Sequence, residues 1–209
     1  MADRTCVFSL VEMLTDGYHD VPRGKVAAVV TCLEMLAPPE PRPVSAPPGL
    51  SIRRVERPSL DEYRALYRLV GEPWLWFSRL RMGDEELAAI VHDPAVGVFF
   101  LEHDGQPQGL LELDRRGFPE IELAFFGLAP ALIGQGAGRY LMAHAMAEAW
   151  RHQPSRFWVH TCTLDHPQAV EFYLKSGFRA YKRMIEIADD PRLAGEAPLD
   201  ALPSHPVIR

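Results

Sequence analysis

The sequence predicts a mixed α/β fold, and two observations lead to that prediction. The expected strands cluster in the middle of the chain, where three follow one another, and the second half then alternates helix, strand, helix and strand. A doubly wound parallel sheet would instead alternate strands and helices from its first element. We therefore expect a meander of strands that continues into a βαβ-like half, with helices packed on the sheet.

Composition limits the functional classes. At 209 residues, with 47% hydrophobic and 24% charged residues, the chain has the size and composition of one soluble domain. A formal net charge of −6 argues against a nucleic-acid partner, which would need a basic surface. No apolar run is long enough to cross a bilayer, so a membrane partner is not expected either.

Cysteine and histidine usage points to a cytoplasmic protein without a metal. Cys6, Cys32 and Cys162 are far apart and form no CxxC pair, which indicates reduced thiols. The N-terminus has an acidic flank and no long apolar segment, so a signal peptide is not expected. The eight histidines show neither HExxH nor a Cys/His ligand spacing, so no metal site is expected.

The first part of the chain is expected to be an appendage. Pro22 suits a first helical turn, and the apolar residues after it predict a helix over residues 22–36. Residues 1–36 would then form a helical appendage that packs on the main domain or on a second copy, giving a homodimer. Residues 37–50 contain six prolines and predict an extended linker.

Residues 51–188 carry the main domain. Strands are predicted at residues 51–56, 96–105, 106–117, 120–129, 156–164 and 179–187, from alternating or β-branched and aromatic residues. Asp104-Gly105 is a hairpin signal between two of these strands. Helices are predicted at residues 59–71, 72–82, 83–93, 138–152 and 165–178 from their apolar spacing, cap residues and a terminal glycine. Residues 189–209 are expected to wrap over the surface or to be partly disordered.

A glycine-rich turn precedes the helix at residues 138–152. Gly134, Gly136 and Gly138 do not have the GxGxxG spacing, because Arg139 or Leu141 falls at the third position, and no GK[ST] follows. Backbone N–H groups of such a turn, together with the helix N-terminus, favour an anion such as pyrophosphate. Arg139 could add a cationic contact.

This part of the chain resembles the GNAT acyltransferase superfamily. The stretch IGQGAG, residues 133–138, matches the family's cofactor motif at Gly136 and Gly138, whereas Ile133 stands where Gln or Arg is usual. The stretch TLDHPQAVEFYLKSGFRAY, residues 163–181, is similar to the family's second half, with Asp165 where Asn is common. The resemblance covers about residues 51–187.

The resemblance implies a mostly antiparallel sheet that splays between its fourth and fifth strands, where acetyl-coenzyme A binds as the acyl donor. The cofactor-binding residues that it implies are Gly127, Leu128, Ala129, Ile133, Gly134, Gln135, Gly136, Ala137, Gly138, Arg139, Asp165, Ala169 and Phe172.

The resemblance also implies the catalytic residues. Glu122 stands where several members have a glutamate that acts as base, although a solvated strand glutamate would fit the residue pattern alone. Tyr173 corresponds to the tyrosine that protonates the departing thiolate, and a core aromatic is its alternative. A backbone N–H near Leu128 would meet the oxyanion. Glu112 is a reserve base or acceptor-binding residue.

The acceptor site is expected in the first half of the domain. Trp74, Trp76 and Phe77 lie near Arg79 and Arg81 in sequence, which suits a substrate with apolar and anionic parts, although core aromatics explain the same pattern. His160 and Cys162 share a strand face but lack an orienting third group, so a buried pair is favoured over a nucleophile.

The sequence therefore predicts an N-acetyltransferase that moves an acetyl group from acetyl-coenzyme A to an amine of a small molecule or protein. The alternative is a catalytically silent acyl-coenzyme A sensor or scaffold.

Overall fold

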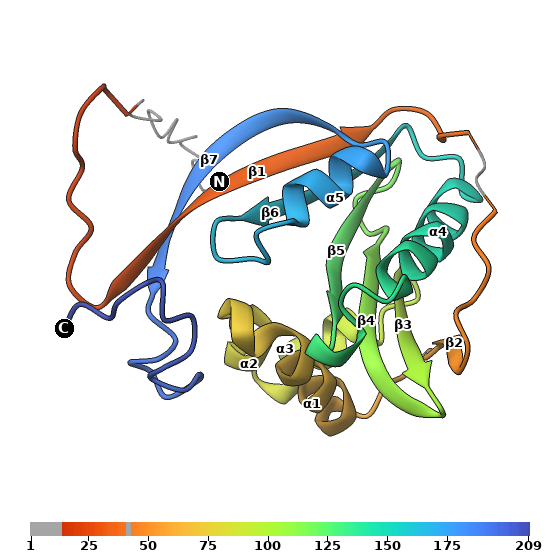
Figure 1. Cartoon of the computed structure of the whole chain (residues 1–209), viewed down its shortest axis with the longest axis horizontal. Helices are drawn as coiled ribbons and strands as arrows, with labels where there is room; N and C mark the ends of the chain where they lie inside the picture. Colours follow the sequence, from red (N-terminus) through yellow and green to blue (C-terminus); the bar gives the residue numbers. More distant parts are fainter. Residues whose placement is uncertain (1–13, 41–42) are drawn as a thin grey trace, which may run out of the picture.

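The computed structural model describes residues 14–40 and 43–209, and its seven strands form a single sheet (Figure 1). The order across the sheet is β2-β3-β4-β5-β6-β1-β7, and all neighbours are antiparallel except β5 and β6. The strands are β1 (Lys25–Met35), β2 (Leu50–Arg54), β3 (Val96–His103), β4 (Gln106–Asp114), β5 (Glu120–Leu128), β6 (Arg156–Cys162) and β7 (Arg179–Asp189). The predicted mixed α/β fold is confirmed.

In the described part of the chain five α-helices accompany the sheet: α1 (Leu60–Gly71), α2 (Ser78–Arg81), α3 (Asp84–Val91), α4 (Ala137–Trp150) and α5 (Ala169–Lys175). The elements predicted between residues 51 and 188 are present, with shifted ends. The exception is residues 72–82, where the expected helix is reduced to a 3-10 turn, Glu72–Trp74, and the single turn of α2. Leu75, between them, has a positive φ of 55°, which interrupts a helix.

The predicted helix over residues 22–36 is wrong, because this segment is the strand β1. It lies between β6 and β7, pairing Val30 with Cys162 on one side and with Met184 on the other. Residues 1–36 therefore do not form a separate helical appendage: the described part of them supplies an interior strand of the domain. Residues 1–13 lie outside the described part of the chain.

The composition of β1 explains why this segment forms a strand and not a helix. A short apolar run does not distinguish a helix from a strand by periodicity, and Pro22 suggested the start of a helix. Three valines and Thr31 in KVAAVVTCLEM are β-branched and fit a pleated surface. Val26, Ala28, Val30 and Cys32 alternate into the interior, as the period of a strand requires.

Residues 37–49 link β1 to β2, which lies at the opposite edge of the sheet, and their described part forms neither helix nor strand. Figure 1 shows this segment passing outside α4. The proline-rich stretch therefore connects two strands of one sheet.

Helices cover both faces of the central strands. One core cluster gathers α1 and α3 against β3 and β4, and includes Tyr63, Tyr67 and Phe100. The other gathers α4 and α5 against β3 to β6 and β1, and includes Leu141, Phe157 and Leu33. This second cluster fixes the N-terminus of α4, and with it the glycine turn, above the sheet.

The sheet opens between β5 and β6. The two strands pair only from Glu120 to Glu122, opposite Arg156 to Trp158, and then separate. A bulge between Glu112 and Leu113 on β4 leaves Ala124 of β5 without a partner. As a result Glu122 shares a face with Phe125, whereas a regular strand would place Phe126 on that face. The splay expected between the fourth and fifth strands of the main domain is thus present.

The C-terminal residues are packed against the start of β1. Asp190 and Arg192 are almost fully buried and form a salt bridge of 2.7 Å, and the Arg192 guanidinium also donates to the carbonyl oxygens of Ala201 and His205. The Gly24 N–H donates to the carbonyl oxygen of Ile208. Residues 189–209 therefore form an ordered wrap.

Leu33 provides a test of the role of β1. Its side chain has no exposure and lies in the α4-side core, so Leu33→Ala should lower the free energy of unfolding by about 2–5 kcal/mol. Val29→Ala, on the same strand but 38% exposed, should cost less than about 1 kcal/mol. Urea unfolding followed by circular dichroism measures both, and equal small effects would contradict an interior β1.

Candidate acyl-transfer site

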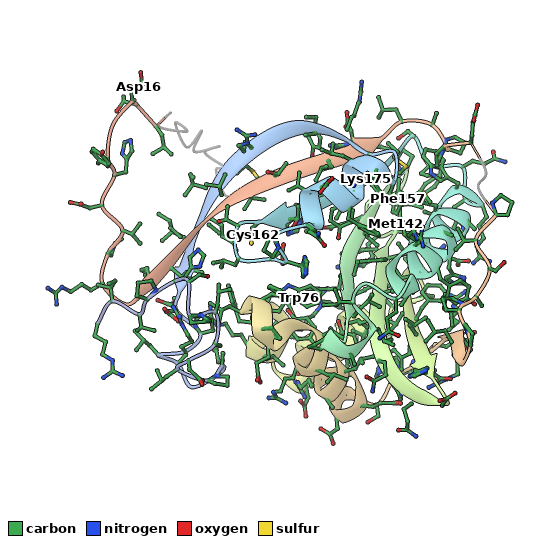
Figure 2. All side chains as sticks on the ribbon, viewed as in Figure 1. Asp16, Trp76, Met142, Phe157, Cys162 and Lys175 are labelled. Carbon is green, nitrogen blue, oxygen red and sulfur yellow. The ribbon has the colours of Figure 1, made fainter. Side chains whose placement is uncertain are left out.

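A cavity of about 760 Å³ occupies the opening between β5 and β6. Its walls come from β5, β6, the N-terminus of α4, the start of α5 and the segment between α1 and α2. Figure 2 shows Trp76, from that segment, and Cys162, at the end of β6, beside this opening. Most of the predicted site residues meet here; the lining includes Trp74, Trp76, Phe77, Glu122, Gly127, Leu128, Ile133, Gly134, Gly136, Gly138, Arg139, Asp165, Ala169, Phe172 and Tyr173.

The glycine turn has the backbone of an anion cradle. Gly134 and Gly136 adopt left-handed φ values of 82° and 84°, which glycine tolerates best. A Cβ at Gly134 would meet nothing within 4 Å, so the space above the turn is open. Gly136 is the N-cap of α4, and no side chain caps that N-terminus. Unbonded N–H groups at a helix start favour a phosphate or pyrophosphate.

Two residues of this turn do not line the cavity. The Gln135 side chain donates to the carbonyl oxygen of Ala131, and Ala137 is fully buried in the core. Their expected cofactor contacts are therefore limited to backbone groups. Arg139 does line the cavity and provides the cation expected there.

The free edge of β5 faces the opening. The Ala129 N–H donates to the carbonyl oxygen of Gln108 at 2.8 Å, toward β4. Because successive N–H groups of a strand point in opposite directions, the Leu128 N–H points toward the gap. The expectation that Ala129 supplies a backbone partner needs correction, since its N–H is occupied and the residue does not line the cavity. By the same alternation the Gly127 N–H points toward β4, so the expectation for Gly127 is limited to its place in the cavity lining, and Leu128 remains as the candidate backbone donor.

Glu122 lies at the base of the opening and contacts His160. Its Oε1 is 3.4 Å from Nδ1 of His160, and the Glu122 side chain is 25% exposed. The bond to Glu122 raises the pKa of His160 above its usual 6.5, against the opposing effect of burial. A carboxylate and an imidazole that both reach solvent in one cavity can accept a proton from a substrate.

Sequence reasoning missed the contact of His160 with Glu122, although it placed His160 on one strand face with Cys162. What was lacking was the parallel pairing of Glu122 with Trp158, which brings the two side chains together. Burial raises the pKa of the Cys162 thiol to about 11, so it is not a thiolate at neutral pH. The expected buried pair is therefore only partly correct: Cys162 is half-buried, but the His160 side chain is 48% exposed.

Tyr173 lies in the wall opposite, and 7% of its surface is exposed. Burial, and then the negative charge of Asp165, raise the pKa of Tyr173 well above its usual 10. Its hydroxyl therefore keeps its proton at neutral pH. It makes no hydrogen bond to any residue within 14–40 or 43–209, so it is free to donate to a group in the cavity.

The Asp165 carboxylate is held by hydrogen bonds within the protein. It accepts hydrogen bonds from Trp76 Nε1 at 2.9 Å, Thr161 Oγ1 at 2.7 Å and the Cys162 N–H at 2.8 Å. These bonds join the end of β6 to the segment after α1, across the cavity. Its predicted cofactor contact is therefore revised to a role in positioning Trp76.

Glu112 is buried away from the cavity. It accepts from the Tyr63 hydroxyl and from the Arg79 guanidinium, each at 2.5 Å, and its side chain has no exposure. It shares the sheet face of Glu122 but does not line the cavity. The prediction of an acceptor-binding or catalytic Glu112 needs correction, because its charge is neutralised within the protein.

The aromatic wall is present, but its arginines are engaged. Trp74 packs edge-on against His166, and Phe77 lies under the Arg81 guanidinium at 4.0 Å. Arg81 binds the carboxylate of Glu196, and Arg79 binds that of Glu112. The expectation that these arginines attract an anionic substrate is therefore not supported.

Two features are absent from the described ranges, 14–40 and 43–209. No group of three or more His, Cys, Asp or Glu side chains is arranged there to hold a metal ion. No helix in those ranges is long and apolar enough to span a bilayer.

Solved structures share this fold at low identity. A GCN5-related N-acetyltransferase from Sphaerobacter thermophilus aligns with a TM-score of 0.60 and 17% identity, over 83% of this chain and 53% of its own. A putative GNAT-family acetyltransferase from Novosphingobium aromaticivorans has a TM-score of 0.54 and 17% identity, over 80% and 67%. This chain thus spans about half to two thirds of the length of those two proteins.

A third structure, an aminoglycoside acetyltransferase from an uncultured soil metagenomic sample in complex with trehalose, has a TM-score of 0.54 and 16% identity, over 66% of this chain and 93% of its own. At these identities the likeness concerns the fold alone. No curated protein matches the sequence. The family profile described as Acetyltransferase (GNAT) family matches residues 63–178, more than half of the chain. The chain therefore belongs to the GNAT family of acetyltransferases.

Proposed function

We propose that the protein is an N-acetyltransferase that uses acetyl-coenzyme A to acetylate an amine. The observation that carries the proposal is that two features line one cavity: the glycine turn, where no side chain caps α4, and the separated strands β5 and β6. The turn suits the pyrophosphate of the donor, and the free edge of β5 suits an extended chain that adds alongside it as a strand would. Acetyl-coenzyme A supplies an activated acyl thioester when bound.

The chain's own residues suit the proton transfers. Glu122, paired with His160, accepts the proton that the amine loses as its nitrogen bonds to the acyl carbon. The Leu128 N–H, directed into the gap, donates to the acyl oxygen as negative charge develops there. Tyr173, in the wall of the cavity, donates its proton to the departing sulfur when the carbon–sulfur bond breaks. The products are an amide and a free thiol.

The charges around the cavity favour a cationic acceptor. Glu122 and Glu186 line it, whereas Glu112 neutralises Arg79 and Asp114 neutralises Arg116. The remaining arginine of the lining, Arg139, lies at the glycine turn, where the donor would bind. A protonated amine would be drawn toward the carboxylates and lose its proton there. Phe77 and Trp74 add apolar surface for the rest of the acceptor. Small-molecule and peptide amines both fit this description.

A thiol-release assay tests the proposal. Acetyl-coenzyme A should yield free thiol only when an accepted amine is added from a panel of polyamines, aminoglycosides, amino acids and peptides. Thermal stabilisation by coenzyme A with no turnover across the panel would favour the binding protein instead. No stabilisation and no turnover would contradict both.

The Glu122–His160 pair predicts a pH dependence. Below the raised pKa of His160 its imidazolium holds the Glu122 carboxylate, and above that pKa the neutral ring leaves the pair free to accept a proton. The kcat/KM should therefore rise with pH, with an inflection above 6.5. In His160→Gln this inflection should move or vanish. An unchanged pH profile in that variant would contradict a role for His160.

A further inference from the structure

The strand β7 is a long exposed edge of the sheet. It has 11 residues, and within the described chain it pairs only with β1. All its residues are exposed except Ala188, which is half-buried. Its apolar side chains are 40–52% exposed: Tyr181, Met184, Ile185 and Ile187. A regular edge of this length offers unpaired backbone groups to another strand.

The apolar residues also continue onto β1. Val29, 38% exposed, lies directly opposite Ile185, and Ala27 lies opposite Ile187. Figure 1 shows the β1–β7 ribbon extending beyond α5, so that helix does not cover its far half. An apolar face next to an open edge is typical of a surface that is covered in an assembly.

The charges on β7 select a second copy of the same strand as its partner. In a twofold antiparallel pair centred on Met184, Lys182 falls opposite Glu186 of the partner subunit, and the reverse contact repeats it. Centring the pair on Arg183 would oppose two arginines. Centring it on Ile185 would place Lys182 opposite an alanine. Centring it on Glu186 would place Arg183 opposite Asp189 but would also oppose two glutamates. Of these four registers, only the one centred on Met184 joins opposite charges twice without opposing like charges.

We propose that the protein forms a twofold homodimer by antiparallel pairing of β7 with β7 of a second copy, centred on Met184. The two sheets then become one continuous sheet, and Ile185 contacts the stem of the partner subunit's Arg183. The bulge at Tyr181 lies outside the central pairs and leaves them undisturbed.

The dimer would reach the acyl-transfer cavity. Glu186 lines that cavity, so Lys182 of the partner subunit would pair with it and leave Glu122 as the carboxylate that attracts a cationic acceptor. The second copy thereby contributes a charge to the site of the first.

Sedimentation velocity at micromolar concentrations tests the assembly with a charge swap. The full chain should sediment as a dimer. Lys182→Glu should weaken dimerisation at least about tenfold, because it opposes two carboxylates, and adding Glu186→Lys should restore it. The matched control, Arg183→Glu, makes the same charge change opposite an isoleucine and should stay largely dimeric. A monomeric full chain, or a double variant no better than Lys182→Glu, would overturn the proposal.

Cysteine cross-linking tests the register independently. Met184→Cys places two thiols across the twofold axis and should give a covalent dimer on mild oxidation, since opposite Cβ atoms lie about 4.5–5.5 Å apart. Ile187→Cys places them several residues apart and should not exceed the background of the native cysteines. Equal cross-linking of both variants would refute the Met184-centred pair. Circular dichroism verifies that each variant is folded.

Discussion

Gly136→Asp should abolish binding of coenzyme A while the protein remains folded. A carboxylate at the N-cap of α4 would lie beside the N–H groups that the turn offers to a pyrophosphate, and it would repel that anion. A Cβ at this position meets only ordinary contacts, 3.8 Å from Arg139 and 3.9 Å from Pro47. The backbone, with φ of 84°, is one that Asp and Asn tolerate better than most residues.

Gly136→Asn is the matched control, because it has the same shape and the same backbone demand without the charge. Titration calorimetry with coenzyme A should show a loss of affinity for Asp at least about tenfold beyond that for Asn, or about 1.4 kcal/mol. Equal affinities of the two variants would place the pyrophosphate elsewhere.

Glu122→Gln should lower kcat/KM by a factor of about 10² to 10⁴, the usual contribution of a general base. Glutamine keeps the size of the side chain and can still hydrogen-bond His160, but it cannot take up the amine proton. Affinity for coenzyme A should change little, because the glycine turn is built by another element. The thiol-release rate with an accepted amine measures the loss.

Glu120→Gln is the control for that variant. Glu120 lies two residues earlier on the same face of β5 and pairs with Arg156 at 3.2 Å. Glu120 does not line the large cavity, so the kcat/KM of Glu120→Gln should stay within about twofold of the value for the unmodified protein. Equal losses in the two variants would indicate a general charge effect and contradict a base at Glu122.

The parts of the fold that could be predicted are those whose signals are local. The hairpin at Asp104-Gly105 follows from two positive φ values that such a turn requires, and α4 follows from its apolar spacing. The strand β1 could not be recognised in this way. Its neighbours β6 and β7 come from the other end of the sequence. Ala27 and Val29 on its outer face are as apolar as the interior residues, so the sequence shows no polar–apolar alternation there.

The candidate site shows the same difference between local and long-range signals. The glycine turn and Tyr173 came from short stretches and lie in the cavity. The predicted role of Glu112 was wrong because its partner Arg79 is distant in sequence, and no sequence pattern shows that a buried guanidinium neutralises it. His160 was overlooked for a related reason: only the pairing of β5 with β6 brings it to Glu122.

The position of β1 also has a kinetic consequence. Val30 must pair with Met184, which is separated from it by most of the chain, so this half of the sheet cannot close until β7 has left the ribosome. Contacts of such long sequence separation slow folding, because the loop must close before they form. During synthesis the apolar side chains of β1 remain exposed until β6 and β7 have been made. The paired Glu122 and His160 should therefore be among the last parts of the molecule to reach their final arrangement.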